Sequence, residues 1–178
     1  MAMQLEECFA RTPGSAPVVQ VHVAPDHRPI GASAVTRIER PPARVWQVVS
    51  EVDRYAERVP MVSKVRRKGE RVEVDLKFRV ALFSAGFEFT ADMSSENQRW
   101  FELRWVAGEP RGIRLRFELS PLDEGRATLI RCDGEFDVMS LGWLVKFFLK
   151  HHPEIQHGVF PGVALVLLDA MRRAAEAP

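Results

Sequence analysis

The strongest constraint on the fold is an alternation of apolar and polar residues that recurs in five stretches of the chain. Between 72 and 82 apolar residues occupy every even position, and charged residues fill most of the odd positions. The alternation returns over 87–93, after a tight turn predicted at Gly86, then over 101–105 and 113–119, and more loosely over 130–136. Because successive side chains of a strand point to opposite faces, each stretch predicts a strand with one apolar face. Together the stretches predict an antiparallel sheet whose apolar face needs a cover.

A helical pattern follows the predicted strands. Almost every residue from Leu141 to Leu149 is apolar, and a second apolar segment runs from about Phe160 to Ala175, with Pro153 between the two. A helix that is apolar on most sides must be enclosed by other elements. We therefore predict a long C-terminal helix, interrupted near Pro153, that lies against the apolar face of the sheet.

The first 31 residues differ from the remainder in composition. They are rich in proline and glycine, so we interpret 1–31 as a tail or linker and 32–178 as one folded domain. Within the tail, the alternation over 18–23 would add an edge strand. After a first domain strand near 32–39, prolines at 41 and 42 favour the start of a helix, and a second short helix is expected over 53–60.

Composition excludes several classes of function. The net charge of +1 gives no support for nucleic-acid binding. The two cysteines, Cys8 and Cys132, are far apart and form no disulfide framework, which is typical of a reducing compartment. The N-terminus does not have the pattern of a signal peptide, and no apolar run reaches the roughly 20 residues of a membrane span. We expect a cytoplasmic protein.

Three stretches of the sequence resemble the START-like superfamily, also called the helix-grip, Bet v 1-like or SRPBCC superfamily. They are 38–50, 52–60 and 117–125, and the likeness is greatest to the polyketide cyclase/dehydrase and coenzyme Q-binding branch. The resemblance implies an α+β fold in which a curved antiparallel sheet of about seven strands wraps around the long C-terminal helix. Two short helices follow the first strand, and a ligand cavity lies between sheet and helix.

The inward parity of the strands identifies the residues expected to line this cavity, to which we add Tyr55 after the first helix and Phe148 on the final helix. The candidate ligand-binding residues are Val74, Leu76, Phe78, Val80, Phe87, Phe89, Phe101, Leu103, Trp105, Leu115, Phe117, Ile130, Tyr55 and Phe148. Hydroxyl groups for a ligand head group are offered by Tyr55, Ser84, Thr90 and Thr128.

The inward positions carry no titratable group suited to acid–base chemistry, so we assign no catalytic residue. Arg104, Arg114, Arg116 and Arg131 fall on the opposite parity, although a register slip at a bulge would turn Arg104 or Arg131 inward. An apolar cavity suits a lipid, an isoprenoid or quinone, or a sterol-like molecule. We expect binding, and transfer, of such a ligand. Two alternatives stay open: an aromatase/cyclase acting on a polyketide-like substrate, and a non-catalytic interaction module.

No cofactor or metal is expected. His151, His152 and His157 lie around Pro153 without the spacing of a tetrahedral site, and we interpret them as loop residues at a break in the final helix. Whether this break gates the cavity is left open by the sequence. A transient contact with an anionic membrane surface is suggested by the basic hairpin over 64–71, although a solvated hairpin tip is the favoured interpretation. Trp143, Phe147 and Phe148 are interpreted as enclosed core rather than as a membrane anchor.

Overall fold

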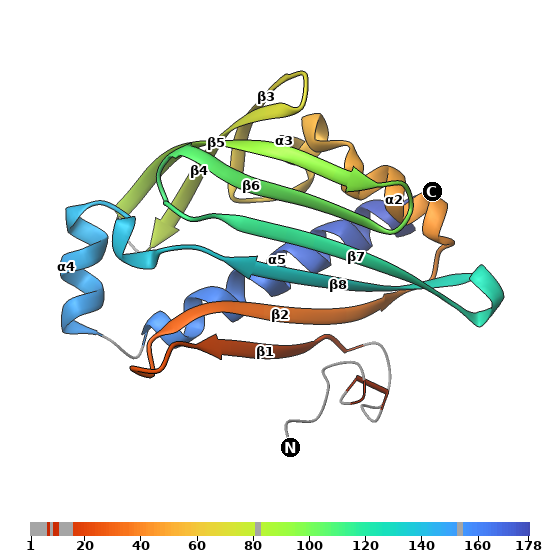
Figure 1. Ribbon diagram of the computed structural model, residues 1–178, viewed down its shortest axis with the longest axis horizontal. Coiled ribbons are helices and arrows are strands. Elements are labelled where there is room, and N and C mark those ends of the chain that lie inside the picture. Colours follow the sequence, from red (N-terminus) through yellow and green to blue (C-terminus); the bar gives the residue numbers. More distant parts are fainter. Residues whose placement is uncertain (1–6, 8, 11–15, 81–82, 153–154) are drawn as a thin grey trace.

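The computed structural model describes residues 7, 9–10, 16–80, 83–152 and 155–178. In this part of the chain eight strands form a curved sheet around the C-terminal helix (Figure 1). The strands are β1 (Val18–Val23), β2 (Pro29–Ile38), β3 (Val62–Lys68), β4 (Arg71–Val80), β5 (Phe83–Glu96), β6 (Trp100–Gly108), β7 (Arg114–Leu122) and β8 (Ala127–Glu135). The helices are α2 (Pro42–Ser50), α3 (Tyr55–Arg58), α4 (Trp143–His151) and α5 (Gln156–Glu176), with 3-10 turns η1 (Val52–Arg54), η2 (Asp123–Gly125) and η3 (Val138–Ser140).

The strand order is β1-β2-β8-β7-β6-β5-β4-β3, and every neighbouring pair is antiparallel. Strands β3 to β8 form a meander, and β2 pairs with β8. An early strand of the chain therefore lies beside the last strand. Strand β1 pairs with β2, with Val18 opposite Val35, so residues 18–23 belong to the sheet. The α+β helix-grip fold predicted from the sequence is confirmed, with eight strands in place of about seven.

Helix α5 lies along the concave face of the sheet, but it is not centred on it (Figure 1). Its backbone approaches β2 most closely, and β8 and β1 next. Strand β2 carries Ala32 and Ala34, and α5 carries Ala164 and Ala170, all four buried in the core. Small side chains on both elements allow the backbones to come close. The other half of the sheet, β4 to β6, carries larger side chains and faces α5 across a wider space.

The far end of α5 is tied to α2. Arg44 of α2 donates hydrogen bonds from Nε to the Ala175 carbonyl and from Nη2 to the Ala174 carbonyl. Arg40, just before α2, donates from Nη2 to the carbonyl of Glu176. The last carbonyls of a helix have no partner within the helix, so these arginines satisfy groups that would otherwise need water. They fix α5 against α2 at one end of the molecule.

Two local predictions are wrong. The sequence predicts a tight turn at Gly86, but Gly86 lies inside β5 opposite Lys77 of β4. A glycine in a strand keeps its place in the hydrogen-bonded ladder, and here the neighbouring residues on both sides continue the pairing. The helix predicted to begin near Phe160 begins at Gln156, with Pro161 inside it. Pro161 is the sixth residue of α5, so it removes one N–H from the helical ladder and its ring crowds the carbonyl of His157.

The convex face of the sheet carries an ion-pair cluster around Glu102, whose residue is only 2% exposed. Arg104 Nη2 lies 2.7 Å from Glu102 Oε1, while Arg114 Nε and Arg116 Nη1 lie 3.2 Å and 3.5 Å from Oε2. Burial acts to raise the pKa of Glu102, but hydrogen bonds from Arg104 and Arg114 outweigh it and hold the pKa below its usual value. The outward direction predicted for these arginines is confirmed.

Replacing the buried carboxylate should lower stability in a pH-dependent way. Glu102→Gln leaves three guanidinium groups without their shared partner, and we expect a loss of about 2 kcal/mol in the free energy of unfolding, or roughly 4–8 °C in Tm. Because the folded pKa is lowered, the stabilisation is fully present above the unfolded value near 4.5 and disappears as pH falls through the folded pKa. Thermal melts of both proteins between neutral and acid pH should therefore converge at low pH. A constant difference at all pH values would contradict this account.

Candidate functional site

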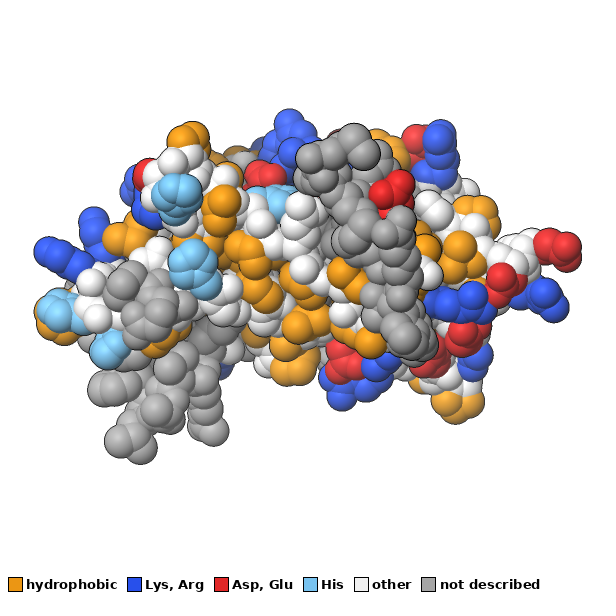
Figure 2. All heavy atoms as spheres, turned by 90° about the horizontal axis from the view of Figure 1, so that it is seen from below, with side chains coloured by type: hydrophobic (Ala, Val, Ile, Leu, Met, Phe, Trp, Pro, Cys, Tyr) orange, Lys and Arg blue, Asp and Glu red, His pale blue; other side chains and the backbone are white. Residues whose placement is uncertain are grey.

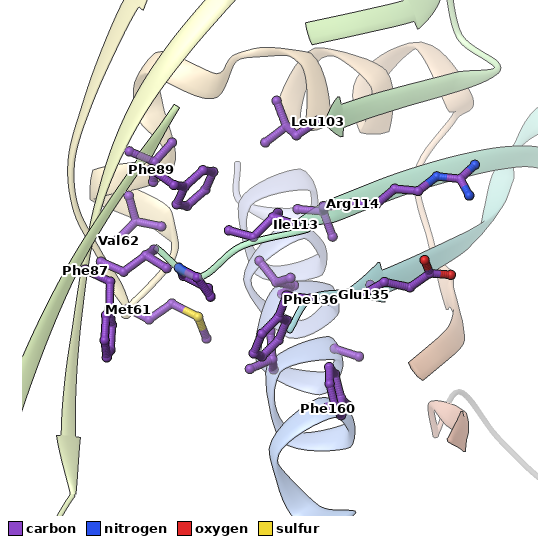
Figure 3. Close-up of a pocket in the computed structure, with 18 of the residues that line it drawn as sticks. Met61, Val62, Phe87, Phe89, Leu103, Ile113, Arg114, Glu135, Phe136 and Phe160 are labelled. Atoms are coloured by element: carbon purple, nitrogen blue, oxygen red, sulfur yellow. The ribbon is translucent and has the colours of Figure 1, made fainter. Parts of the chain in front are cut away.

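The space between α5 and the β4–β6 half of the sheet is a pocket of about 250 Å³. Val74 and Leu76 of β4, Phe87 and Phe89 of β5 and Leu103 of β6 line one side. The opposite side is α5, which contributes the apolar side chains Val159, Phe160, Val163, Ala164 and Leu167. Figure 3 shows Phe89 and Met61 extending from the β4–β5 side toward the side of α5, where Phe136 and Phe160 lie. The pocket is walled almost completely by carbon.

Seven of the residues predicted from the sequence are brought together in this lining. They are Tyr55, Val74, Leu76, Phe87, Phe89, Leu103 and Leu115. Six of them are inward side chains of the sheet near the end where α4 lies. The seventh, Tyr55, is at the start of α3. Whether these residues bind a ligand stays a prediction. The side chains of Phe78, Val80 and Phe148 lie outside the part of the structure that is described.

Four predicted residues do not line the pocket. Phe101, Phe117 and Ile130 are buried on the concave face, but they pack in the half of the core where α2 lies close to β7 and β8. Trp105 is half-buried, and its indole N–H donates to the carbonyl of Gly108 at 3.1 Å. Strand parity determines which face a residue occupies. The position along the strand decides whether it meets a packed helix or the open space.

The lining also includes residues that were not among the candidates, although Ile113, Cys132 and Phe136 share the apolar parity of the alternating stretches 113–119 and 130–136. These are Met61, Val62, Ala85, Pro110, Ile113, Arg114, Cys132, Gly134, Glu135, Phe136, Leu141, Val159, Phe160, Val163, Ala164 and Leu167. Most belong to connections or to α5 rather than to the strong alternating stretches. The apolar run that begins at Val159 was a usable signal, because it predicts a helix face that must meet the sheet. Nothing in the sequence indicated that Pro110 would be buried at the pocket.

Two charged residues, Arg114 and Glu135, lie at the edge of the pocket, opposite one another on β7 and β8. In Figure 3 both charged groups point away from the apolar side chains. Arg114 Nε is bound to Glu102 on the convex face, 3.2 Å away. Only the stems of these residues reach the lining, so neither supplies a charge to the interior.

Two ionisable groups belong to the interior of the lining, Tyr55 and Cys132. The Tyr55 hydroxyl donates to the carbonyl of Val49 at 2.6 Å, which ties α3 to α2. Burial raises the pKa of Tyr55 and also that of the Cys132 thiol. Both groups are therefore protonated at neutral pH. The interior can offer a ligand a weak thiol and a phenolic oxygen, but no charge.

A serine, a histidine and an aspartate meet on the outer face, and their geometry is not that of a catalytic triad. His22 Nε2 lies 2.8 Å from Ser33 Oγ, while Ser33 Oγ donates to Asp133 Oδ1. In a triad the histidine stands between the other two and removes the serine proton. Here the serine stands in the middle, its proton is committed to Asp133, and its side chain is buried. The cluster joins β1, β2 and β8.

The comparisons with known proteins agree with this fold. The family model described as polyketide cyclase/dehydrase and lipid transport matches residues 38–153. No curated protein matches the sequence. The START-like resemblance found in the sequence is confirmed.

Solved structures with the same fold share little sequence with this chain. A START superfamily protein from Mycobacterium smegmatis is 17% identical with a TM-score of 0.55, covering 81% of this chain and 95% of its own. A conserved protein from Geobacillus kaustophilus is 11% identical with a TM-score of 0.63, covering 80% and 93%. The di-domain ARO/CYC StfQ from the steffimycin biosynthetic pathway is 13% identical with a TM-score of 0.53, covering 81% of this chain and 49% of its own.

The Cys132 thiol should be unreactive in the folded protein. It is buried, and its raised pKa leaves almost no thiolate at pH 8, the form that attacks alkylating reagents. We expect iodoacetamide to modify the Cys132 peptide at least about a hundredfold more slowly in the native protein than in urea. Peptide mass spectrometry of a Cys8→Ser variant measures this directly. Equal rates in both conditions would mean that the pocket interior is open to water.

Proposed function

Because the chain belongs to the polyketide cyclase/dehydrase and lipid transport family, we propose that it binds a hydrophobic small molecule in the pocket between α5 and strands β4–β6 and passes it on. The observation that carries the proposal is the pocket itself, an open space of about 250 Å³ with an uncharged, almost wholly apolar wall. The ligand classes that fit are a lipid chain, an isoprenoid or quinone, and a sterol-like ring system.

The size of the pocket restricts how such a ligand is held. Ligand sites are typically about 300–1,000 Å³, so this pocket of about 250 Å³ lies just below that range. It accommodates one ring system or a section of one chain, and a longer ligand would extend out through the opening. Each buried methylene contributes about 0.8 kcal/mol relative to water, and a bilayer supplies nearly the same. Such a site favours exchange with a membrane over permanent retention, and contact with an anionic membrane surface is part of the proposal.

The cyclase alternative requires a group that moves protons at the substrate. Among the described lining residues, Arg114 and Glu135 direct their charges outward, and Tyr55 and Cys132 have raised pKa values. A general acid or base near neutral pH needs a pKa near that pH. These features favour binding over catalysis. The third alternative, an interaction module, would not need the open apolar space.

A neutral dye tests the proposal. N-phenyl-1-naphthylamine fluoresces when it leaves water, and we expect it to bind the wild-type protein and to be displaced by extracted lipid. Val163 lines the pocket from α5, so Val163→Phe should fill part of the space and weaken dye binding by roughly tenfold. Val166→Phe is the matched control, because Val166 is also half-buried on α5 but is not part of the lining.

Native mass spectrometry with lipid extraction gives the ligand class. A co-purifying apolar molecule that is absent from Val163→Phe would support carriage. An apo mass after gentle purification, together with equal dye binding by both phenylalanine variants, would contradict the proposal.

A further inference from the structure

Helix α4 lies at one end of the molecule, apart from α5 (Figure 1). The chain enters α4 just after Leu141 and leaves it shortly before Val159, and both of these residues line the pocket. Among the described side chains of α4, Leu149 is buried in the core. The Gln156 side chain donates from Nε2 to the Leu149 carbonyl at 3.3 Å, which links α4 to the start of α5. Both ends of α4 are therefore close in sequence to segments that line the pocket.

The outer face of α4 is apolar and basic. At 100° per residue, Lys146, Phe147, Lys150 and His151 share one face, roughly opposite the side of Leu149. Phe147 is 57% exposed, the most exposed of the large hydrophobic side chains in the described structure. Its ring lies 4.3 Å from that of His151, centroid to centroid. The prediction that Phe147 is enclosed core is wrong, because α4 stands apart from the sheet (Figure 1) and Phe147 lies on the side of the helix that faces solvent.

The charges of this face are of one sign. From residue 138 to residue 153 the sequence contains no Asp or Glu. Lys146 and Lys150 are both exposed, and neither forms an ion pair within the described residues. Ile155, 38% exposed, extends the apolar surface beyond the helix. Figure 2 shows histidine side chains gathered at the end of the molecule where α4 lies, with lysine or arginine beside them.

The basic hairpin between β3 and β4, the other surface of the same charge, is different. Arg66 Nε lies 2.9 Å from Glu73, and Lys68 Nζ lies 2.8 Å from the same carboxylate. Arg71 pairs with Asp92 at 2.9 Å. Acidic partners on β4 and β5 thus neutralise most of the hairpin cations, and their field is short-ranged. Lys146 and Lys150 have no such acidic partner among the described residues, so their positive charges are not neutralised.

We propose that α4 is the membrane-docking element of this protein, and that it lies in the interface of an anionic bilayer with Phe147 among the lipid chains and Lys146 and Lys150 at the head groups. Short helices with an apolar strip and basic flanks bind in this way, through buried apolar area and attraction to anionic lipid. The inference rests on the proposed function for its purpose, since docking by α4 brings the pocket opening to the bilayer from which an apolar ligand would come.

Vesicle sedimentation tests the inference with the full-length protein. We expect the wild type to bind vesicles of phosphatidylcholine mixed with phosphatidylserine, and to bind phosphatidylcholine alone much less. Lys146→Gln/Lys150→Gln should lower partitioning onto the anionic vesicles by about 30-fold. Phe147→Ser should lower it by roughly tenfold or more, because it removes the side chain that inserts. Both sets of side chains are exposed, so the fold should be retained.

The matched control is Lys64→Gln/Arg67→Gln, which removes the same charge from exposed positions of the hairpin. It should keep vesicle binding. Any one of three results would overturn the inference. These are vesicle binding by the α4 variants at the wild-type level, loss of vesicle binding in the hairpin control, and no preference of the wild type for anionic vesicles. Binding of the naphthylamine dye in solution is measured on the same proteins. If the wild type does not bind the dye, the pocket proposal alone is refuted. If the α4 variants bind the dye and also bind vesicles as the wild type does, docking by α4 alone is refuted.

Discussion

The close packing of α5 against β2 is the contact on which the remaining structure depends. Alanines at 32 and 34 on the strand and at 164 and 170 on the helix allow the two backbones to approach. A helix drawn to one side of a curved sheet cannot also fill the other side. The phenylalanines of β5 stand across the wider half without closing it, and the pocket is the space that remains. The position of the site thus follows from where the small residues are.

Charge is separated from this interior with little exception. Glu102 and its three arginines, and Asp133 with Ser33, bind one another on the convex face, so the polar groups of β6, β7 and β8 are satisfied outside the core. The buried Tyr55 hydroxyl is committed to the Val49 carbonyl. A ligand in the pocket meets dispersion contacts and little else. Affinity then follows apolar area, and selectivity has to come from shape and from the opening.

Helix α4, between two segments that line the pocket, provides a second surface, which is an exposed apolar and basic face. None of the helices in the described part of the chain has the length and apolar character needed to cross a bilayer. Yet α4 carries an exposed phenylalanine beside two lysines that have no acidic partner among the described residues, and the segments on either side of it line the pocket. The arrangement joins a site for an apolar molecule to a surface suited to the edge of a membrane. The pocket and the docking helix are separable by mutation, since their residues do not overlap.

The sequence by itself determined the strands, the faces they present and the enclosing fold, because the alternation of apolar and charged residues has a period that only a half-buried strand satisfies. It therefore predicted six lining residues along the sheet, from Val74 to Leu115, and Tyr55 after α2 as a seventh. It assigned Phe101, Phe117 and Ile130 to the same group, since parity carries no information on position along the strand. Only the tertiary structure decided that those three are buried outside the pocket, that Pro110 and Phe160 line it, and that Phe147 faces solvent. These outcomes depend on the distance between α5 and each strand and on where α4 leaves the sheet, and such distances arise from packing between segments that the local pattern does not connect.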